Sequence, residues 1–337
     1  MSGKAVILNS FGAPNAVLQV VSAPRPTPGP KQVLVHVKLR PVNPADLFSV
    51  MGAYPGFAPK TFPATPGLEG YGVVAEVGAG VTRVKVGQRV SPFFDTISGH
   101  GSWQEFIVID EQALALVPDN VSDESAAQLI VNPVTVVLML KELKIPKGEF
   151  LLQSAAGSTL GRQVIQVAAA QGIKTINLVR RSAQIDELKA LGADIVVSTE
   201  GLETADAIAK AILAATGGKH AYGAIECVGG VTTAAITMSV RHGGFVLVYG
   251  AMVGMEGTVH VPSFIFRDVT YKGFWLGSEL ARMTNQQIQA VTSEVFELMS
   301  KGIMVPNSGE IFPLDKVVEA VIKSNATARG GKILIGN

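Results

Sequence analysis

The sequence predicts an α/β protein of two domains, in which a doubly wound parallel sheet is joined to a β-rich domain. The length of 337 residues favours two domains over one. Residues 1–125 read as short strands separated by glycine and proline, whereas residues 126–269 alternate between helix and strand. Residues 270–337 end in a helix and a strand that we expect to return to the first domain. The predicted domains are therefore 1–125 with 270–337, and 126–269.

The composition excludes several classes of function. Hydrophobic residues make up 47% of the chain and charged residues only 16%, which suits a large core. Lys+Arg 28 and Asp+Glu 27 give a net charge of +1, so no excess of charge indicates a nucleic acid or a membrane surface as partner. The single cysteine, Cys227, rules out an intramolecular disulfide and a cysteine-rich metal site, and it fits a reducing compartment.

Membrane and secretory segments are not expected. No stretch has the ~18 uninterrupted apolar residues that a membrane span needs. The best candidate, residues 126–140, contains Gln128, Asn132 and Pro133. The chain enters a predicted strand at residues 5–8, which leaves no room for a secretory signal. We expect a cytoplasmic protein, or a mitochondrial matrix protein if a transit peptide has been removed.

The β-rich part is predicted to be a small barrel or sandwich. A short helix begins at residues 42–47, with Asn43 as N-cap and Pro44 at the first helical position. The proline-rich loop at residues 51–56 follows and carries Tyr54 at its tip, and loops of this kind are often functional. The predicted strands are 4–9, 18–22, 32–39, 71–77, 89–92 and 102–109.

The pattern changes at Ser122, which caps a predicted helix with Ser125 in capping-box spacing. Asn132 and Pro133 interrupt this helix, which continues over residues 134–143. The alternation that follows predicts one doubly wound sheet. Its strands are predicted at 150–154, 174–181, 195–197, 223–228 and 244–249, and its helices at 162–171, 187–191, 205–215 and 232–240. A strand at 270–275 and a helix at 284–300 come next, and the tail is predicted as a helix at 317–324 followed by a strand at 332–335.

The turn after Ser154 is typical of a dinucleotide-binding βαβ unit. There a strand turns sharply into a helix whose N-terminal amides can hold a pyrophosphate. Gly157 lets the backbone approach the phosphates, and Gly161 lets helix and strand pack closely. The usual spacing is Gly-x-Gly-x-x-Gly; here the two glycines are one residue further apart and Ala155 stands at the first position. The alternative is a tight turn of an ordinary doubly wound sheet.

The end of the second strand of this unit favours NADP over NAD. An NAD site usually has Asp or Glu there, which accepts hydrogen bonds from the ribose hydroxyls. This chain has Arg180 and Arg181, and no carboxylate before Asp186. Arginine suits the extra 2′-phosphate of NADP because its guanidinium can bind it in a bidentate pair. The alternative is that both arginines are simply solvated.

Together these features resemble the medium-chain dehydrogenase/reductases over essentially the whole chain. The resemblance rests on the glycine turn after a β-rich domain, on residues 42–46 and 67–70 and on Tyr249-Gly250. It implies a GroES-like catalytic domain and a Rossmann cofactor domain. Zinc alcohol dehydrogenases of this family bind metal through a cysteine and a His–Glu pair, whereas here Asn43 lies near the cysteine position and Leu68 replaces the histidine before Glu69. The resemblance is therefore to the zinc-free, quinone-oxidoreductase-like members, without a metal.

Within that group the chain resembles the mitochondrial-type 2-enoyl thioester reductases, the enoyl-[acyl-carrier-protein] reductases. These enzymes reduce a C=C bond conjugated to a thioester, which needs a hydride at the β-carbon and a proton at the α-carbon. The matching segments are Gly52-Ala53-Tyr54, Gly101-Ser102-Trp103, Val131-Asn132-Pro133-Val134-Thr135, residues 175–180, Tyr249-Gly250-Ala251-Met252 and Gly273-Phe274-Trp275-Leu276.

The resemblance implies that Tyr54 is the proton donor. A phenol with an ordinary pKa of about 10 stays protonated at neutral pH, and it can donate a proton or hydrogen-bond a developing enolate oxygen. From the residues alone, a tyrosine that packs on a proline-rich loop is the alternative.

The resemblance also implies a set of NADPH contacts. Asn132 is expected near the nicotinamide ribose and Lys332 near the cofactor. The other expected contacts are Gly157, Ser158, Thr159 and Leu160 at the pyrophosphate, Arg180, Arg181 and Ser182 at the 2′-phosphate, and Tyr249, Gly250, Ala251, Met252, Phe274, Trp275 and Leu276 along the nicotinamide. The alternatives are that Asn132 caps a helix, that Phe274 and Trp275 belong to the core, and that Lys332 is a surface lysine.

Three further residues are interpreted without a catalytic role. His100, in a glycine-flanked loop, is expected to be solvent-exposed, and Cys227 to be an inert buried thiol. Glu69, without its histidine neighbour, is interpreted as a structural carboxylate.

The predicted function is NADPH-dependent reduction of trans-2-enoyl thioesters carried on CoA or acyl carrier protein. The first alternative is an NADPH:quinone or enone reductase on the same scaffold, and the second is a non-catalytic NADPH-binding protein. Arg267 and Lys272 are possible contacts for the carrier arm. By resemblance we expect a homodimer, with residues 245–275 as the place to look for its interface.

Overall fold

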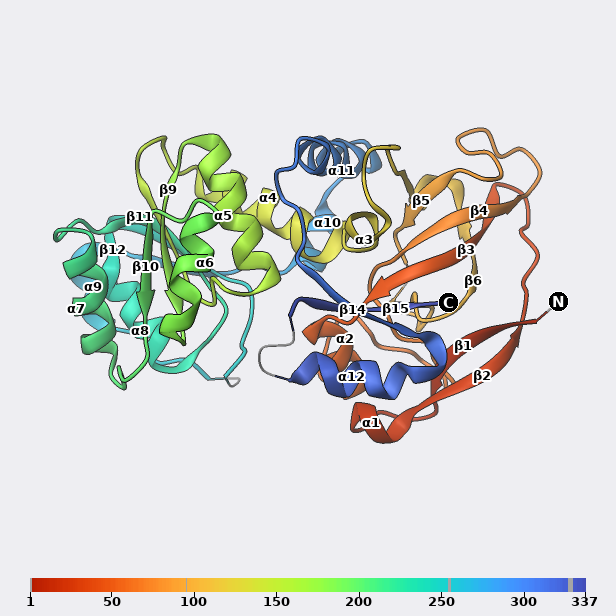
Figure 1. Ribbon diagram of the computed structural model, residues 1–337, viewed down its shortest axis with the longest axis horizontal. Coiled ribbons are helices and arrows are strands. Elements are labelled where there is room, and N and C mark those ends of the chain that lie inside the picture. The colour runs from red at the N-terminus through yellow and green to blue at the C-terminus, as the bar shows by residue number, and fades with distance from the viewer. Residues whose placement is uncertain (1, 95, 254–255, 327–329) are drawn as a thin grey trace. The chain divides into compact units, whose positions relative to one another are not determined.

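The computed structural model describes residues 2–94, 96–253, 256–326 and 330–337 (Figure 1). The chain forms two compact units. Unit 1 comprises Met1–Val134 and Met283–Asn337, and unit 2 comprises Thr135–Arg282. Unit 2 is thus continuous in sequence, whereas unit 1 is assembled from both ends of the chain.

Unit 2 is built on a six-stranded parallel sheet. Its strands are β8 (Phe150–Gln153), β9 (Lys174–Val179), β10 (Ile195–Ser198), β11 (Ala221–Glu226), β12 (Val240–Val248) and β13 (Thr270–Gly273). They lie in the order β10-β9-β8-β11-β12-β13, and every neighbouring pair is parallel. Numbered along the chain this is the order 3-2-1-4-5-6 of a doubly wound dinucleotide-binding sheet, so the predicted fold class is confirmed.

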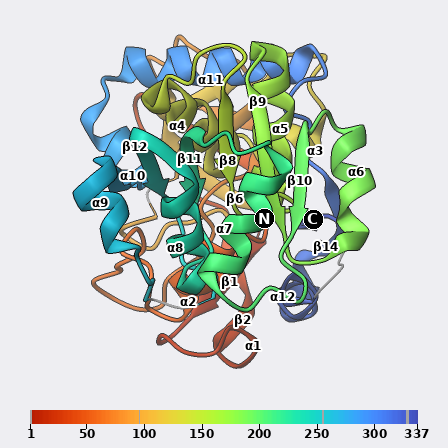
Figure 2. The same cartoon turned by 90° about the vertical axis from the view of Figure 1, so that its left-hand side faces the viewer.

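Helices cover both faces of this sheet (Figures 1 and 2). The crossovers α5 (Thr159–Gln171) and α6 (Ile185–Ala190) lie on one face, and α7 (Ala205–Ala215) and α8 (Gly230–Ser239) pack together on the other. The chain passes from one face to the other after β10, in the connection through α7 to β11. Strand β11 lies beside β8, and the strand order reverses between these two strands. The remaining helices of unit 2 are α4 (Thr135–Leu143), α9 (Val261–Arg267) and α10 (Leu276–Arg282).

Unit 1 is β-rich. A two-stranded sheet pairs β1 (Ser2–Leu8) with β2 (Leu18–Pro24). The larger sheet contains β3 (Gln32–Pro41), β4 (Tyr71–Val77), β5 (Arg89–Pro92), β6 (Phe106–Asp110), β7 (Leu114–Leu116), β14 (Ser308–Pro313) and β15 (Lys332–Gly336), in the order β14-β15-β3-β4-β5-β7 with β6 also on β3. Its helices are α1 (Pro14–Val17), α2 (Pro44–Val50), α3 (Asp123–Ala127), α11 (Asn285–Ser300) and α12 (Val317–Asn325).

The buried residue Arg40 binds the last strand, β15, to neighbouring segments of unit 1. Its guanidinium donates to the carbonyls of Lys38, Ser102, Gln104 and Ile335 and to Asn337 Oδ1, at 2.8–3.4 Å. Burial lowers the pKa of Arg40 to about 9. Since β15 pairs antiparallel with β3, these bonds fix the tail of the chain to unit 1.

Several predicted boundaries of helices and strands were wrong. The strand expected from residue 102 begins only at Phe106, because the amides of Ser102 and Trp103 bind the carbonyls of Gly67 and Pro66 instead of a neighbouring strand. The helix expected from residue 162 begins at Thr159, because the Ser158 hydroxyl accepts the Gly161 amide and caps it. The strands expected to end at residues 181 and 275 end at 179 and 273.

Five of the helices and strands described had no sequence prediction: α1, β7, α9, α10 and β14. Helix α9 begins with proline in its first turn but consists mostly of apolar, β-prone residues. Asn132 and Pro133 do interrupt a helix, and they do so in a single π-helical turn, η2 (Ile130–Val134), between α3 and α4.

Candidate cofactor and active site

The turn between β8 and α5 has the geometry of a phosphate-binding turn. Ala155 takes the left-handed conformation, with φ of 48°, at the position where the usual motif has glycine. A Cβ on Gly161 would lie 2.7–2.8 Å from backbone atoms of Ala155 and Ala156, so only glycine allows α5 to approach the strand this closely. The structural role predicted for Gly161 is therefore supported by the packing.

Gly157 lies at the open end of the same turn. A Cβ there would collide with the side-chain amide of Gln184, which comes from the loop after β9. Ser158 caps α5, and Thr159 and Leu160 form its first turn, where backbone amides have no partner within the helix. The Leu160 side chain is buried, so only the backbone of this residue could contact a ligand. This arrangement fits the pyrophosphate of a dinucleotide.

The residues after β9 carry the charges expected for the 2′-phosphate. Arg180, Arg181 and Ser182 are all exposed. Arg180 has no hydrogen bond or ion pair to any described residue. Ser182 is already engaged, since its amide and hydroxyl both donate to Glu200 Oε2, at 3.0 and 2.7 Å. The loop therefore offers two exposed guanidinium groups that make no hydrogen bond or ion pair to a described residue, and a pair of donors that holds an anion.

A buried polar cluster lies where β11 ends. Glu226 Oε1 accepts from the amides of Val228 and Gly229 at 2.6 and 3.1 Å, and its Oε2 accepts from the Thr233 hydroxyl at 3.2 Å. These bonds hold the strand end against the start of α8. Sequence reasoning missed this residue, and its only signal is a carboxylate at the end of an apolar strand.

Cys227 is buried beside this cluster. Its amide binds the Ser154 hydroxyl at 3.0 Å, and burial raises the pKa of its thiol to about 11. The inert thiol predicted from the sequence is supported by this environment. The Tyr249 hydroxyl is also buried, and burial followed by the neighbouring Cys227 raises the pKa of this phenol further above its usual value.

The segments after β12 and β13 divide into backbone and side-chain roles. Residues 249–252 run along the end of β11, where the amides of Tyr249 and Met252 bind the carbonyls of Glu226 and Cys227 at 2.9 Å. Phe274 is buried and Trp275 is exposed, while Gly250, Ala251 and Leu276 are half-buried and Met252 is exposed. The core alternative thus holds for Phe274 but not for Trp275.

The predicted site residues of unit 2 lie at the carboxyl ends of the strands of its sheet. The turn at Gly157, the loop at Arg180 and the segments at Tyr249 and Phe274 each follow the carboxyl end of a strand, and all the strands are parallel. In open α/β sheets ligands bind outside the carboxyl ends, next to the point where the strand order reverses. Here that point lies beside the Gly157 turn.

Unit 1 contains a buried chain of hydrogen bonds from Lys332 to Glu69. Lys332 is 3% exposed, and its Nζ donates to Asn43 Oδ1 at 2.7 Å. Asn43 Nδ2 in turn donates to Glu69 Oε1 at 2.9 Å. The surface-lysine alternative for Lys332 is wrong, because its ammonium group is buried in unit 1. Glu69 is structural, as expected, and it is also central to this network.

Glu69 fixes the π-helical turn that carries Asn132. Its Oε2 accepts from the amides of Ile130 and Val131, both at 2.8 Å. Burial raises the pKa of Glu69, and these bonds oppose that effect. Asn132 comes next in the turn; it is 9% exposed, and its side-chain amide has no hydrogen-bond partner among the described residues. The carboxylate therefore holds a turn that presents an amide with unused hydrogen-bonding groups.

Helix α2 connects this network to the loop of Tyr54. Asn43 is the N-cap and Pro44 the first helical residue, as predicted. Asp46 Oδ2 accepts the Asn43 amide at 2.7 Å, and its Oδ1 accepts the Leu68 amide at 2.9 Å. Burial raises the pKa of Asp46 to about 7.

Tyr54 is half-buried and packs against a core cluster of unit 1. A Cβ on Gly56 would lie 2.5 Å from its ring, so the ring covers this glycine. The packing alternative is thus part of its environment.

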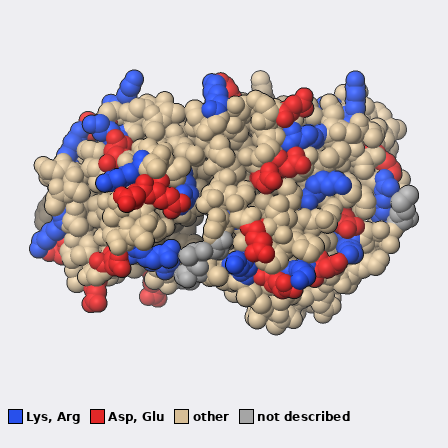
Figure 3. Space-filling model, viewed as in Figure 1, with Lys and Arg blue, Asp and Glu red and all other residues tan. Residues whose placement is uncertain are grey.

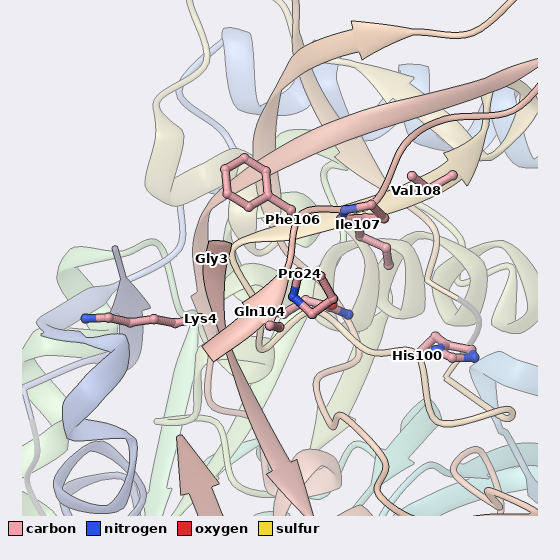
Figure 4. A pocket seen from close by; sticks show the side chains of 10 residues that line it. Gly3, Lys4, Pro24, His100, Gln104, Phe106, Ile107 and Val108 are labelled. Carbon is pink, nitrogen blue, oxygen red and sulfur yellow. The ribbon is translucent and has the colours of Figure 1, made fainter. Parts of the chain in front are cut away.

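The cavities found in unit 1 lie elsewhere. One, of about 370 Å³, is lined by β1, the end of β2 and β6 (Figure 4). Lys4, His100 and Phe106 line it, and none of the predicted site residues does. His100 is exposed, as expected. We assign this cavity no part in the reaction.

The two expected contacts for a carrier arm are committed to other partners. The Arg267 guanidinium donates to the carbonyls of Thr237, Met238 and Val240 at 2.6–2.8 Å. Lys272 forms an ion pair with Glu142. Both residues therefore contact other parts of unit 2, and their contact with a carrier arm stays a prediction.

The charges on the surface agree with the composition. On the face shown in Figure 3, acidic and basic side chains are interspersed. Among the described residues no group of three or more His, Cys, Asp or Glu is placed to hold a metal ion, and no described helix is long and apolar enough to cross a membrane.

Comparison with known proteins identifies the family. Residues 29–119 match the alcohol dehydrogenase GroES-like domain, and residues 159–297 match the family described as zinc-binding dehydrogenase. The mitochondrial enoyl-[acyl-carrier-protein] reductase of Dictyostelium discoideum is 32% identical over 99% of this chain and 95% of its own length. The Homo sapiens protein of the same name is 31% identical over 94% and 84%.

A solved structure supports the same placement. The quinone oxidoreductase of Pseudomonas syringae is 29% identical, covers 99% of this chain and 100% of its own, and superposes with a TM-score of 0.86. The resemblance predicted from the sequence is confirmed. The chain is an oxidoreductase that belongs to the medium-chain dehydrogenase/reductase family, in the group of the enoyl-[acyl-carrier-protein] reductases and quinone oxidoreductases.

Proposed function

We propose that this enzyme reduces the C=C bond of trans-2-enoyl thioesters with NADPH. The observation that carries the proposal is the pairing of a phosphate-binding turn with an arginine loop in unit 2. Gly157 and Gly161 form the turn, and Arg180 next to it has no partner among the described residues. The relatives named enoyl-[acyl-carrier-protein] reductase support the thioester substrate.

The residues present fit the cofactor. The first turn of α5, next to Gly157, has backbone amides without a partner within the helix, which suits a pyrophosphate. Arg180 offers a planar guanidinium for a 2′-phosphate. When bound, NADPH supplies the hydride. The other NADPH contacts predicted from the sequence, among them Ser158 and Lys332, are proposed ligands of the cofactor. Lys332 would act through Asn43, because its Nζ donates to Asn43 Oδ1.

In the proposed reaction the β-carbon receives a hydride and the α-carbon receives a proton. Negative charge develops on the thioester oxygen after the hydride has reached the β-carbon and before the α-carbon is protonated, and a hydrogen bond from a phenol would stabilise it. Tyr54 is the proposed proton donor to the α-carbon. The side-chain amide of Asn132 is proposed to orient the nicotinamide ribose, since the turn fixed by Glu69 leaves its hydrogen-bonding groups unused.

The second candidate is reduction of quinones or enones on the same scaffold. It is supported by the likeness to the Pseudomonas syringae quinone oxidoreductase. A quinone needs no phosphopantetheine arm, and the arm contacts expected at Arg267 and Lys272 are engaged within unit 2.

The test is NADPH oxidation by the purified enzyme with trans-2-hexenoyl-CoA, with 1,4-benzoquinone, and with NADH in place of NADPH. Turnover of the enoyl-CoA with NADPH supports the proposal. Turnover of quinone alone would establish the second candidate, and tight NADPH binding without turnover would establish a non-catalytic binding protein.

The Tyr54→Phe variant tests the proton donor. It should lose about 10²- to 10⁴-fold in rate if Tyr54 is the general acid. Tyr222→Phe is the matched control, because Tyr222 stacks with Arg241 in unit 2 and its hydroxyl has no partner among the described residues. Equal rates in both variants would remove Tyr54 from the mechanism.

We also propose a homodimer formed through unit 2. Strand β13 ends the sheet, and it pairs with β12 alone among the described strands. Beside it in sequence, α9 exposes 67% of Ile265 and 74% of Phe266. Residues 254–255 of the expected interface lie outside the described residues. Two copies related by a two-fold axis could cover both features.

Light scattering during size-exclusion chromatography tests the dimer. The wild type should elute as a dimer and the Ile265→Asp/Phe266→Asp double variant as a monomer. A monomeric wild type would refute it. We further propose that the enzyme works in the cytoplasm or the mitochondrial matrix. The names of the two relatives, which are called mitochondrial, support the matrix. Fractionation of expressing cells tests this location.

A further inference from the structure

Glu200 lies at the place proposed for the 2′-phosphate of NADPH. It follows β10 by two residues, and the amide of Thr199 binds the carbonyl of Val179 at 2.8 Å, which ties this segment to the end of β9. From there the Glu200 carboxylate reaches the loop of Arg180 and Arg181. Its Oε2 accepts from both the amide and the hydroxyl of Ser182.

The carboxylate is held there as an anion. The two bonds from Ser182 lower the pKa of Glu200, and the nearby charge of Arg181 adds to the effect. Glu200 is therefore ionised at neutral pH. A carboxylate and a phosphate present the same kind of acceptor to such donors, so Glu200 takes the contacts that a 2′-phosphate would use.

We propose that Glu200 is a specificity-determining residue, which weakens binding of the 2′-phosphate and supports binding of an unphosphorylated ribose. The inference rests on the proposed NADPH site. To bind NADPH, the chain must release Glu200 from Ser182 and accept a carboxylate close to a phosphate dianion, and like charges at this distance repel. To bind NADH, the same carboxylate accepts from the ribose hydroxyls, as an acidic residue does in an NAD site.

Arg180 and Glu200 thus act in opposite directions on the same cofactor choice. Arg180 is unengaged and attracts the 2′-phosphate, whereas Glu200 screens Arg181 and occupies Ser182. The expected result is an enzyme that prefers NADPH but still accepts NADH. Removing the charge of Glu200 should sharpen the preference, while removing that of Arg180 should reverse it.

The matched control is Glu203, three residues further along the chain. It is exposed, and it makes no hydrogen bond or ion pair to any described residue. Glu200→Gln and Glu203→Gln change the net charge equally and at nearly the same place. The glutamine at position 200 keeps an oxygen that can accept from Ser182, so this variant changes the charge and leaves the size unchanged.

The experiment is titration calorimetry of the full chain with 2′,5′-ADP and with NADH at low and high salt. Glu200→Gln should bind 2′,5′-ADP about tenfold more tightly at low salt, with a smaller gain at high salt. It should bind NADH several-fold more weakly. Glu203→Gln should stay within twofold of the wild type for both ligands. Thermal unfolding checks that all variants fold.

The outcomes separate this inference from the proposed site. If the wild type binds 2′,5′-ADP and Glu200→Gln binds it no more tightly than Glu203→Gln does, the inference is wrong and the site stands. If Glu200→Gln changes both ligands in the same direction, its role is structural and the inference is also wrong. If the wild type binds neither ligand, the proposed site and the inference both fail.

Discussion

Replacing Glu69 by glutamine should break the buried hydrogen-bond chain of unit 1, because every member donates toward its carboxylate. Lys332 Nζ donates to Asn43, and Asn43 Nδ2 donates to Glu69 Oε1. The amides of Ile130 and Val131 donate to Oε2. A glutamine has one acceptor oxygen and one NH₂ group, so one junction must place two donors face to face, whichever way the amides turn.

The magnitude follows from these contacts. A buried donor left unpaired costs about 1–3 kcal/mol. The buried Lys332 also loses the negative charge that compensates for its own burial, and breaking a buried pair costs about 3–5 kcal/mol. We expect Glu69→Gln to lower the free energy of unfolding by about 3 kcal/mol. A change of 1 kcal/mol lowers Tm by about 2–4 °C in a domain of this size, so Tm should fall by about 6–12 °C.

Circular dichroism during thermal unfolding measures this change. Glu310→Gln is the matched control, because Glu310 is exposed on β14 and has no hydrogen bond or ion pair to any described residue. Its Tm should stay within about 1 °C of the wild type, as for an ordinary surface substitution. A double-mutant cycle with Lys332→Met should show strong coupling. Additive effects, or equal Tm values for the two glutamine variants, would refute the argument.

Three further predictions follow from the packing and the titrating groups. Gly161→Ala places a Cβ against the backbone of Ala155 and Ala156. The strain of about 1–3 kcal/mol exceeds the gain of about 1 kcal/mol in helix propensity, so urea unfolding should show a lower free energy of unfolding. A gain in stability would contradict the packing. The pKa of Asp46 is about 7 in the folded chain and about 3.9 in an unfolded chain, so the folded chain holds more protons between pH 4 and 7. Stability therefore falls as pH rises through this window, and Asp46→Asn should flatten that slope. A change in stability that is the same at every pH would disprove this prediction. Cys227 should not react with a thiol reagent in the native enzyme but should react fully in urea, and rapid native labelling would contradict its burial.

The sheet of unit 2 could be predicted because its signals are local. Each strand is a short apolar run, each crossover is long enough for a helix, and the right-handed rule then limits the strand order. The cofactor turn was found through Gly157 and Gly161 for the same reason. Its left-handed residue is Ala155, at the first position of the glycine motif; the motif marks this position, but an alanine there gives no sign of a left-handed conformation, which alanine rarely takes.

Other parts depend on contacts between distant segments. Strand β6 begins later than predicted because the amides of Ser102 and Trp103 bind the carbonyls of Gly67 and Pro66. The burial of Lys332 depends on a partner far away along the chain, Asn43, and the sequence shows only a lysine before an apolar strand. Glu200 lies on a different strand from the arginines, so its bond to Ser182 depends on the sheet order. Such side chains become visible only when the strands have been placed.

The position of β15 has a consequence for the order in which this protein is made. Strand β15 lies between β14 and β3, and Arg40 is bound to the carbonyl of Ile335. The larger sheet of unit 1 is therefore incomplete until the final strand has left the ribosome, while the continuous unit 2 can fold earlier. During synthesis the segment of β3 at residues 39–41, which pairs with β15, lacks this partner for the time needed to make nearly 300 residues, at about 5–20 residues per second. An open strand edge invites pairing with other chains, so this interval is when a nascent chain would most need a chaperone.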